Sequence, residues 1–481
     1  MRTMMNNWKI YSIIAATVLA LGGCKVPSLS PVEKVCLPDT FIRGKDTTTV
    51  ASLSWKSFFP DTCLIAYIDT ALAANHSFLQ TMEHISMARA QLKTSKGALL
   101  PEITLGIDGG IQRFGEFTMD GVGNSTTNTP DLPGNKHIPD PYRNLNLGLN
   151  FQWEADIWGK LTDRKRAAAI RWMQSVEAQR LARTLLISEV ATQYYKLIGL
   201  DQKRVVLEKA IRKTEESCIL TGELMKEGEV SRLSVDQFNS RRLQLEEILL
   251  DTEQQIAETE RAFALLLGKL SLKVIRPGFE TMSSYRFPSE VGIPAQLLQN
   301  RPDIRAAELE LLASKADLSA ARKAFFPSLM IGGSGGFNAF SLQEWFSSPA
   351  SLVYNVAAGI TAPIFKRHEV RALWLTSKSR QRIALLDYHY IALRSYQEVV
   401  NLITASEQMN KRKALKQEES RIHHRSIDNA NELFKTGFAG YLDVLSADER
   451  YLECELERIE LNIAYCQLHA MLYKALGGGR F

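Results

Sequence analysis

The amino-acid sequence predicts an α+β membrane protein in which four β-strands and several long helices are divided between two copies of one structural unit. Three observations support this fold class. A block of sequence recurs once along the chain. Four segments of about ten residues alternate between apolar and polar side chains. No proline interrupts residues 142–276 or the residues after Pro363, and both stretches carry apolar side chains at helical spacing.

The repeat consists of four pairs of matching segments in the same chain order. Residues 224–235 (LMKEGEVSRLSV) match residues 433–444 (LFKTGFAGYLDV) at an offset of 209. The same offset relates Glu189-Val190 to Glu398-Val399 and Leu267-Gly268 to Leu476-Gly477, while residues 98–103 match 324–329 at an offset of 226. Such matches indicate two copies of one unit. We expect the copies at residues 64–272 and 294–481, with an equatorial segment at residues 273–293 between them.

Each copy contains two segments that alternate like β-strands, within residues 101–153 and 327–363. The clearest is residues 144–153, where one face carries Leu145, Leu147, Leu149, Phe151 and Trp153 and the other mostly asparagine and glutamine. A half-buried sheet in a soluble domain shows the same alternation. Segments of about ten residues are long enough to cross a bilayer at a steep tilt, so we favour transmembrane strands. The polar residues 121–141 predict a long loop.

Four strands do not close a barrel, and an open edge leaves backbone groups unpaired in lipid. The barrel is therefore expected to be shared between chains. Two copies supply eight strands and three supply twelve, and the strand pattern alone leaves both open.

The proline-free stretches predict helices of matched length. Residues 158–228 give a helix of roughly 105 Å, and residues 231–268 and 64–98 give helices of roughly 55 and 50 Å. We expect the second copy to repeat this arrangement, with the hairpin tips at Gly228 and Gly437. An ordinary helix bundle would account for the helices but not for the strands.

The first residues predict export and lipid attachment. Arg2 and Lys9 flank the apolar residues 10–21, which are too few to span a bilayer, so residues 1–23 are expected to be a signal peptide. Leu21-Gly-Gly-Cys24 resembles the bacterial lipobox, which implies an acylated Cys24 and an acylated segment at residues 24–63. Lys25, in place of an aspartate, fits the outer membrane. The alternative is an incidental cysteine after an ordinary cleavage site.

The sequence contains no recognisable catalytic or metal-binding motif, and we expect no enzyme activity, cofactor or metal. The five cysteines after Cys24 are odd in number and have no short spacing, which excludes a disulfide framework, although a Cys36–Cys63 pair remains open. The formal net charge of +5, without a basic patch interleaved with aromatic residues, argues against a nucleic-acid partner.

Several motifs resemble those of TolC/NodT-type outer-membrane efflux lipoproteins. They are the lipobox, residues 153–161 (WEADIWGKL), residues 294–308 (PAQLLQNRPDIRAAE), residues 441–445 (YLDVL) and residues 475–479 (ALGGG). The resemblance extends from Cys24 to the C-terminus. It implies a homotrimer, with a twelve-stranded barrel in the outer membrane and a periplasmic barrel of long helices. It also implies a role as the exit duct of a tripartite pump, with a periplasmic adaptor and an inner-membrane RND-type transporter as partners.

Two positions depart from the family pattern. Residues 366–368 (KRH) replace a glycine-containing turn, and Ser446 stands where the family commonly has an aspartate that constricts the tunnel. The periplasmic gate is therefore expected to use another acid or an apolar closure. The candidates are Asp443, Asp448, Glu449, Leu442 and Leu445.

Two other functions remain open from the sequence. One is the exit channel of a type I protein-secretion system, which would share this fold. The other is a periplasmic lipoprotein scaffold without a channel. The exported compound is not specified by any motif.

Overall fold

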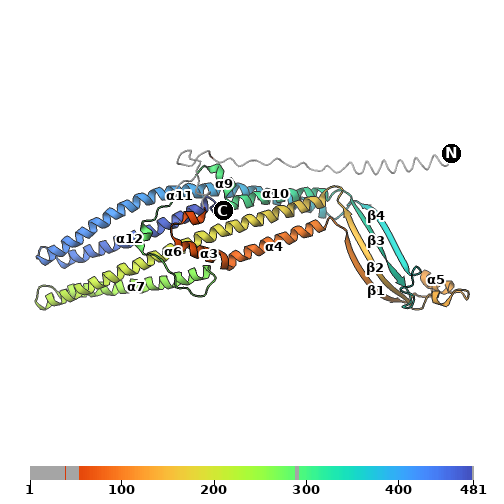
Figure 1. Cartoon of the computed structure of the whole chain (residues 1–481), viewed down its shortest axis with the longest axis horizontal. Coiled ribbons are helices and arrows are strands. Elements are labelled where there is room, and N and C mark those ends of the chain that lie inside the picture. The colour runs from red at the N-terminus through yellow and green to blue at the C-terminus, as the bar shows by residue number, and fades with distance from the viewer. Residues whose placement is uncertain (1–37, 39–53, 288–291, 479–481) are drawn as a thin grey trace. The chain divides into compact units, whose positions relative to one another are not determined.

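The computed structural model describes residue 38 and residues 54–287 and 292–478 (Figure 1). The chain divides into two compact units. The described part of the first unit comprises residues 93–167 and 314–385, and that of the second comprises residue 38 and residues 54–92, 168–287, 292–313 and 386–478. Cys24 and Cys36 lie outside the described residues.

The first unit contains a four-stranded antiparallel sheet in the order β1-β2-β3-β4. The strands are β1 (Glu102–Gln112), β2 (Tyr142–Ala155), β3 (Ser328–Ala339) and β4 (Leu352–Thr361). These are the four strands that alternation predicts, at nearly the predicted bounds. Consecutive strands are neighbours throughout, so each copy of the repeat contributes one hairpin to the sheet.

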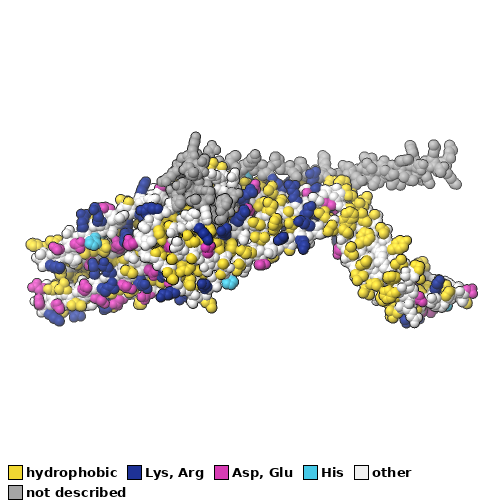
Figure 2. All heavy atoms as spheres, in the orientation of Figure 1, with side chains coloured by type: hydrophobic (Ala, Val, Ile, Leu, Met, Phe, Trp, Pro, Cys, Tyr) yellow, Lys and Arg dark blue, Asp and Glu magenta, His cyan; other side chains and the backbone are white. Residues whose placement is uncertain are grey.

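The register places most of the large apolar side chains of the four strands on the same face. Leu147 lies opposite Ile107 on β1 and Phe337 on β3, and Phe337 lies opposite Leu352 on β4. Because residues opposite one another share a face, the intervening asparagine, serine and glycine residues occupy the other face. Much of the apolar face is exposed, and hydrophobic side chains cover a large part of the strands in Figure 2. The exposed large side chains on this face are Ile103, Leu105, Ile107, Ile111, Leu149, Leu352, Tyr354, Val356 and Ile360.

The two outer strands, β1 and β4, each pair along one edge only within the described residues. An unpaired strand edge exposes a row of backbone donors and acceptors that is ready to pair with another strand. No helix among the described residues combines the length and apolar character needed to cross a membrane.

The connection between β1 and β2 is more ordered than the predicted polar loop. It contains the helix α5 (Met119–Thr127) and the short 3-10 helix η2 (Gly134–Lys136). The hydroxyl of Thr118 accepts a hydrogen bond from the amide of Gly121 at 3.1 Å, which caps the start of α5. A single capping side chain within a glycine-rich stretch is too weak a sequence signal to predict this helix.

The long helices occur in pairs of equal length. The first helices, α6 (Lys160–Lys226) and α11 (Glu369–Lys435), have 67 residues each, and α7 (Arg232–Leu266) and α12 (Tyr441–Ala475) have 35 each. A helix of 67 residues is about 100 Å long. These bounds agree with the predicted matched helices. In the second unit, α6 and α7 form one hairpin and α11 and α12 form the other (Figure 1).

The helix expected at residues 64–98 is instead two helices, α3 (Thr62–Ala74) and α4 (His76–Gly97). Asn75 interrupts them because its backbone is extended, its Oδ1 accepts from the amide of Phe78, and its Nδ2 donates to the carbonyl of Leu266. The second copy has the same break between α9 (Pro294–Asn300) and α10 (Pro302–Lys323). There Arg301 precedes a proline, which disfavours helical backbone.

The two breaks make equivalent contacts. The side chain of Asn75 donates to the carbonyl of Leu266 at the end of α7, and that of Arg301 donates to the carbonyl of Ala475 at the end of α12. Both helix ends are followed by a glycine with positive φ, at 68° in Gly268 and 85° in Gly477. Residues that correspond in sequence at the repeat offsets of 226 and 209 therefore also make equivalent contacts.

The core of the second unit gathers aromatic side chains from distant parts of the chain. Phe58, Tyr194, Phe263 and Tyr473 are almost completely buried in one cluster. Beside it, Oδ2 of Asp61 accepts hydrogen bonds from the hydroxyls of Tyr194 and Tyr285, at 2.8 and 2.9 Å. This network joins the segment before α3 to α6 and to the residues after α8 (Phe279–Ser283). The short helix α2 (Trp55–Phe58) is anchored in the same core.

Candidate functional site between the helical hairpins

Both hairpins of the second unit turn at a glycine. Gly228 and Gly437 have φ angles of 83° and 78°, in the left-handed region that a glycine adopts without strain. Residues after each glycine bond back to the preceding helix, through Glu229 to Leu224 and through Phe438 to Leu433. Such bonds satisfy the free carbonyls of a helix end. The structure thus places both glycines in the hairpin tips where the repeat predicts them.

The hairpins are joined through their apolar faces. Leu207, Ile211, Leu245 and Leu452 form a small buried cluster between α6, α7 and α12. Nearer the tips, the rings of Phe238 on α7 and Tyr441 on α12 lie 6.4 Å apart. These contacts place the charged residues of α6 and α7 opposite those of α12.

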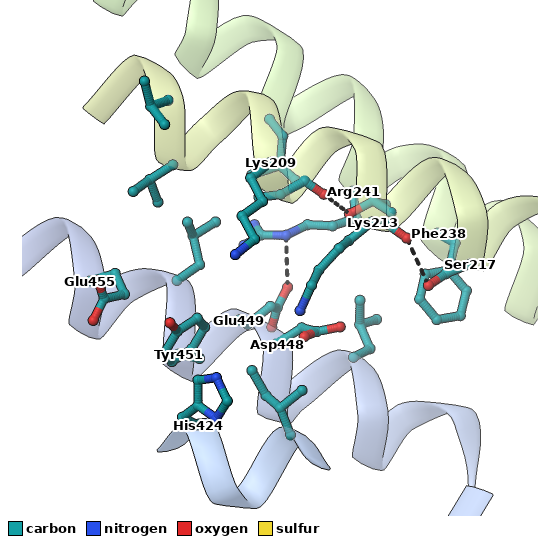
Figure 3. A pocket seen from close by; sticks show the side chains of 18 of the residues that line it. Lys209, Lys213, Ser217, Phe238, Arg241, His424, Asp448, Glu449, Tyr451 and Glu455 are labelled. Carbon is teal, nitrogen blue, oxygen red and sulfur yellow. Dashed lines mark hydrogen bonds and ion pairs between the residues drawn. The ribbon is translucent and has the colours of Figure 1, made fainter. Parts of the chain in front are cut away.

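A cavity of about 290 Å³ lies between the hairpins (Figure 3). Apolar side chains, including Leu245 and Leu452, line one part of it. The rest is charged: cations come from α6 and α7, and acids come from α11 and α12. The charged lining residues are Lys209, Lys213, Arg241, Asp428, Asp448, Glu449 and Glu455.

One ion pair crosses the cavity. Nε of Arg241 on α7 lies 3.6 Å from Oε1 of Glu449 on α12. The Glu449 side chain is about half exposed, at 48%, so water screens this pair. Pairs of this kind contribute roughly 0.2–1 kcal/mol. The ion pair is therefore a weak connection between the hairpins, and a small change in conditions suffices to break it.

The carboxyl of Asp448 is less well stabilised in the cavity than that of Glu449. Burial raises the pKa of its carboxyl above the ordinary aspartate value, although the positive charges of Lys213 and Arg241 act in the opposite direction. Within the described residues, no cation lies close enough to form an ion pair with it. Its ionised form is therefore disfavoured in this packing arrangement.

The structure brings together three of the five predicted gate candidates. Leu445, Asp448 and Glu449 line the cavity, and the first two share a helical face, as their spacing predicts. Asp443 lies apart: its Oδ2 accepts from the amide of Gly440 at 2.8 Å and thereby caps α12. Leu442 is 53% exposed in this chain.

The sequence predicted acids and leucines at this site, but the cationic neighbours Arg241, Lys209 and Lys213 were missed. A usable signal was present in the repeat. Arg241 is repeated in the second copy as Arg450, at the offset of 209, and Glu449 is the residue just before it. An acid at nearly the same height above the tip as a base in the other hairpin favours a contact between the two hairpins.

No metal centre is apparent in the described part of the chain, where no three His, Cys, Asp or Glu side chains gather as ligands. The adjacent histidines of α11 have separate partners, because neighbours on a helix point apart. Nε2 of His423 faces Glu419 at 3.7 Å, and Nδ1 of His424 faces Asp428 at 3.1 Å.

A sheet of strands about ten residues long with one apolar face suits a membrane β-barrel. The model of the family described as "Outer membrane efflux protein" matches residues 67–269 and 293–478. The chain belongs to this family. It is therefore an outer membrane efflux protein.

Two relatives and one solved structure illustrate the similarity. The chain is 26% identical to the pyoverdine export outer membrane protein OpmQ of Pseudomonas putida, covering 88% of this chain and 87% of the relative. It is 28% identical to the toluene efflux pump outer membrane protein TtgI of Pseudomonas putida, covering 98% of both. The fold matches the open state of the MtrE channel of Neisseria gonorrhoeae with a TM-score of 0.80 and 24% identity, covering 94% and 98% of the two chains.

Proposed function

We propose that three copies of this chain form the exit duct of a tripartite efflux pump that exports small molecules, with no catalytic step of its own. The observation that carries the proposal is the four-stranded sheet, which has one apolar face and two unpaired edges. Unpaired edges are not tolerated in lipid, so β1 of one copy is expected to pair with β4 of the next. Three copies supply twelve strands, in the range of water-filled barrels.

The proposed partners bind at the periplasmic end of such a duct. The hairpin tips at Gly228 and Gly437 are the parts available to a periplasmic adaptor, which in turn holds an inner-membrane RND-type transporter. The names of the relatives favour this assignment over a type I protein-secretion channel, because they refer to pyoverdine export and toluene efflux. Membership of the efflux family likewise weighs against a scaffold without a channel.

Two measurements on the full-length protein test this function. Protein extracted from outer membranes in detergent should behave as a trimer and should produce discrete conductance steps in planar bilayers. Cells lacking the gene should become more sensitive to toluene, and the intact gene should restore tolerance. A monomer that gives no conductance would refute the channel. A conducting trimer whose loss leaves the cells as tolerant of small molecules as before would refute only the proposed small-molecule cargo.

We also propose that the cavity between the hairpins controls the periplasmic opening. Movement of one hairpin away from the other would separate Arg241 from Glu449 and expose the Leu445 and Asp448 face of α12. In this proposal Asp443 acts as a helix cap, and Leu442, exposed beside it, is available for an apolar closure between copies.

Single-channel recording separates these roles. Glu449→Gln removes the weak ion pair and should increase the open probability by up to about fivefold, the effect expected from a surface pair of at most about 1 kcal/mol. Glu453→Gln, on an exposed part of the same helix, is the matched control and should conduct like the original protein. Identical conductance and selectivity for Glu449→Gln, Asp448→Ala and Asp443→Ala would exclude an acidic gate and leave the apolar closure by Leu442 and Leu445.

A further inference from the structure

The turn between β4 and α11 has a conformation that its sequence does not favour. Arg367 and His368 have φ angles of 43° and 65°, in the left-handed region that side chains other than glycine rarely adopt. The equivalent position in the first copy, at the repeat offset of 209, is Gly159 with a φ of 73°. The second copy thus places His368 where the first has a glycine, and Arg367 where the first has Trp158.

Positive charge is concentrated on this turn and on the helix that follows it. Residues 362–385 contain six lysines and arginines and a single acid, Glu369. Farther along the same helix, residues 416–435 contain four basic and four acidic residues, so the excess is local. All six basic side chains of the first stretch are exposed: Lys366, Arg367, Arg371, Lys378, Arg380 and Arg382.

These cations have no acidic partner among the described residues, unlike two other basic residues of the same unit. Lys323 forms an ion pair with Asp163 at 2.6 Å, and Lys160 is paired with Glu154. By contrast, Lys366, Arg367 and Arg371 form no ion pair among the described residues. Unpaired, exposed cations at one end of a helix are available to an external anion.

Apolar side chains lie directly beside this charge. Ile364 and Phe365 are 97% and 80% exposed, and they follow Ile360, which belongs to the apolar face of the sheet. Large apolar residues next to lysine and arginine are typical of the boundary between a bilayer and water. The exposed indole of Trp158, on the equivalent connection after β2, fits the same boundary.

We propose that Ile364–His368 and the first turn of α11, including Arg371, bind the phosphates of anionic phospholipids in the leaflet that adjoins the helices. This inference rests on the proposed channel, because it requires the sheet to cross a membrane. Ile364 and Phe365 would enter the edge of the hydrocarbon, and Lys366, Arg367 and Arg371 would reach the headgroups. The chemistry is that of a phosphodiester held by several cations.

The test uses the full-length trimer in phosphatidylcholine nanodiscs that contain a small fraction of labelled phosphatidylglycerol. We expect the original protein to enrich phosphatidylglycerol in its lipid shell and to lose this enrichment at high salt. The triple variant Lys366→Gln/Arg367→Gln/Arg371→Gln should bind phosphatidylglycerol about a hundredfold more weakly, since each cation near an anionic surface contributes roughly fivefold.

The control Lys411→Gln/Arg412→Gln/Arg425→Gln removes the same charge from exposed positions farther along α11 and should retain the original affinity. If the triple variant does not assemble, Lys366→Gln and Arg371→Gln alone should each weaken binding by roughly three- to fivefold. A trimer that conducts but does not prefer phosphatidylglycerol, or a triple variant with unchanged affinity, would overturn this inference and leave the channel intact. A protein that does not insert into bilayers would overturn both.

Discussion

Asp448 is a single residue whose ionised side chain destabilises the folded protein. Burial in the cavity raises the pKa of its carboxyl, and the groups that face it are Lys213 on α6, Arg241 on α7 and, on its own helix, Glu449. Because the pKa is higher in the folded than in the unfolded protein, the ionised carboxylate lowers the free energy of unfolding at neutral pH. That cost disappears as the pH falls through the raised pKa towards the ordinary aspartate value.

Asp448→Asn should therefore raise the melting temperature at about pH 7 and lose this advantage near about pH 3, where the original carboxyl is mostly protonated in both states. Thermal unfolding of the purified protein at the two pH values measures the effect. Glu453→Gln, on an exposed part of the same helix, should change neither value. A lower melting temperature for Asp448→Asn at neutral pH would show that Asp448 contributes a favourable interaction instead.

Gly268 shows how a single missing side chain allows two segments to meet. A Cβ at this position would lie 2.5 Å from the carbonyl oxygen of Ala74, and the φ of 68° is unfavourable for alanine. We expect Gly268→Ala to lower the free energy of unfolding by roughly 1–3 kcal/mol. Gly222, within α6, faces open space, so Gly222→Ala should instead stabilise by up to about 1 kcal/mol. Denaturant unfolding of both variants checks the sign, and equal effects would contradict the close approach at Gly268.

Among the helices and strands, the sequence predicts those whose apolar and polar side chains recur regularly along one segment. Alternation predicted the four strands, including β3, where glycine dilutes the apolar pattern. The absence of proline and the Gly228 break predicted α6 to within two residues, and the repeat predicted a second helix of the same length, α11. The break at Asn75 was missed because it depends on the carbonyl of Leu266, which is distant in sequence. Periodicity identifies a helical face, but it does not identify the helix that packs against it, so Arg241 opposite Glu449 was also missed.

The two faces of β2 provide a test of the sheet. Leu147 belongs to the apolar face and Asn146 to the opposite, polar face. An arginine on the lipid side near the middle of the membrane costs about 2–4 kcal/mol, whereas sites facing the lumen are tolerant. Leu147→Arg should therefore reduce the amount of heat-modifiable trimer in outer membranes, and Asn146→Arg should not. Equal amounts of trimer for both variants would indicate that neither face of the sheet contacts lipid.

The whole molecule, as a proposed trimer, is attached to the membrane in two chemically different ways. Cys24 follows Leu21-Gly-Gly and is the proposed site of acylation, while the sheet contacts the bilayer through its side chains. We expect Cys24→Ser to abolish incorporation of labelled palmitate while trimers still form, because a closed barrel holds itself in the membrane. Unchanged labelling would show that the cysteine is not acylated, and loss of trimers would show that assembly depends on the anchor.

The open edges of the sheet also have a genetic consequence. If β1 of each copy completes β4 of the next, a chain with a damaged edge spoils every assembly that it joins. With equal amounts of damaged and intact chains, only about one trimer in eight would consist of intact chains alone. Edge variants should therefore be dominant over the intact gene, whereas a loss of expression should be recessive.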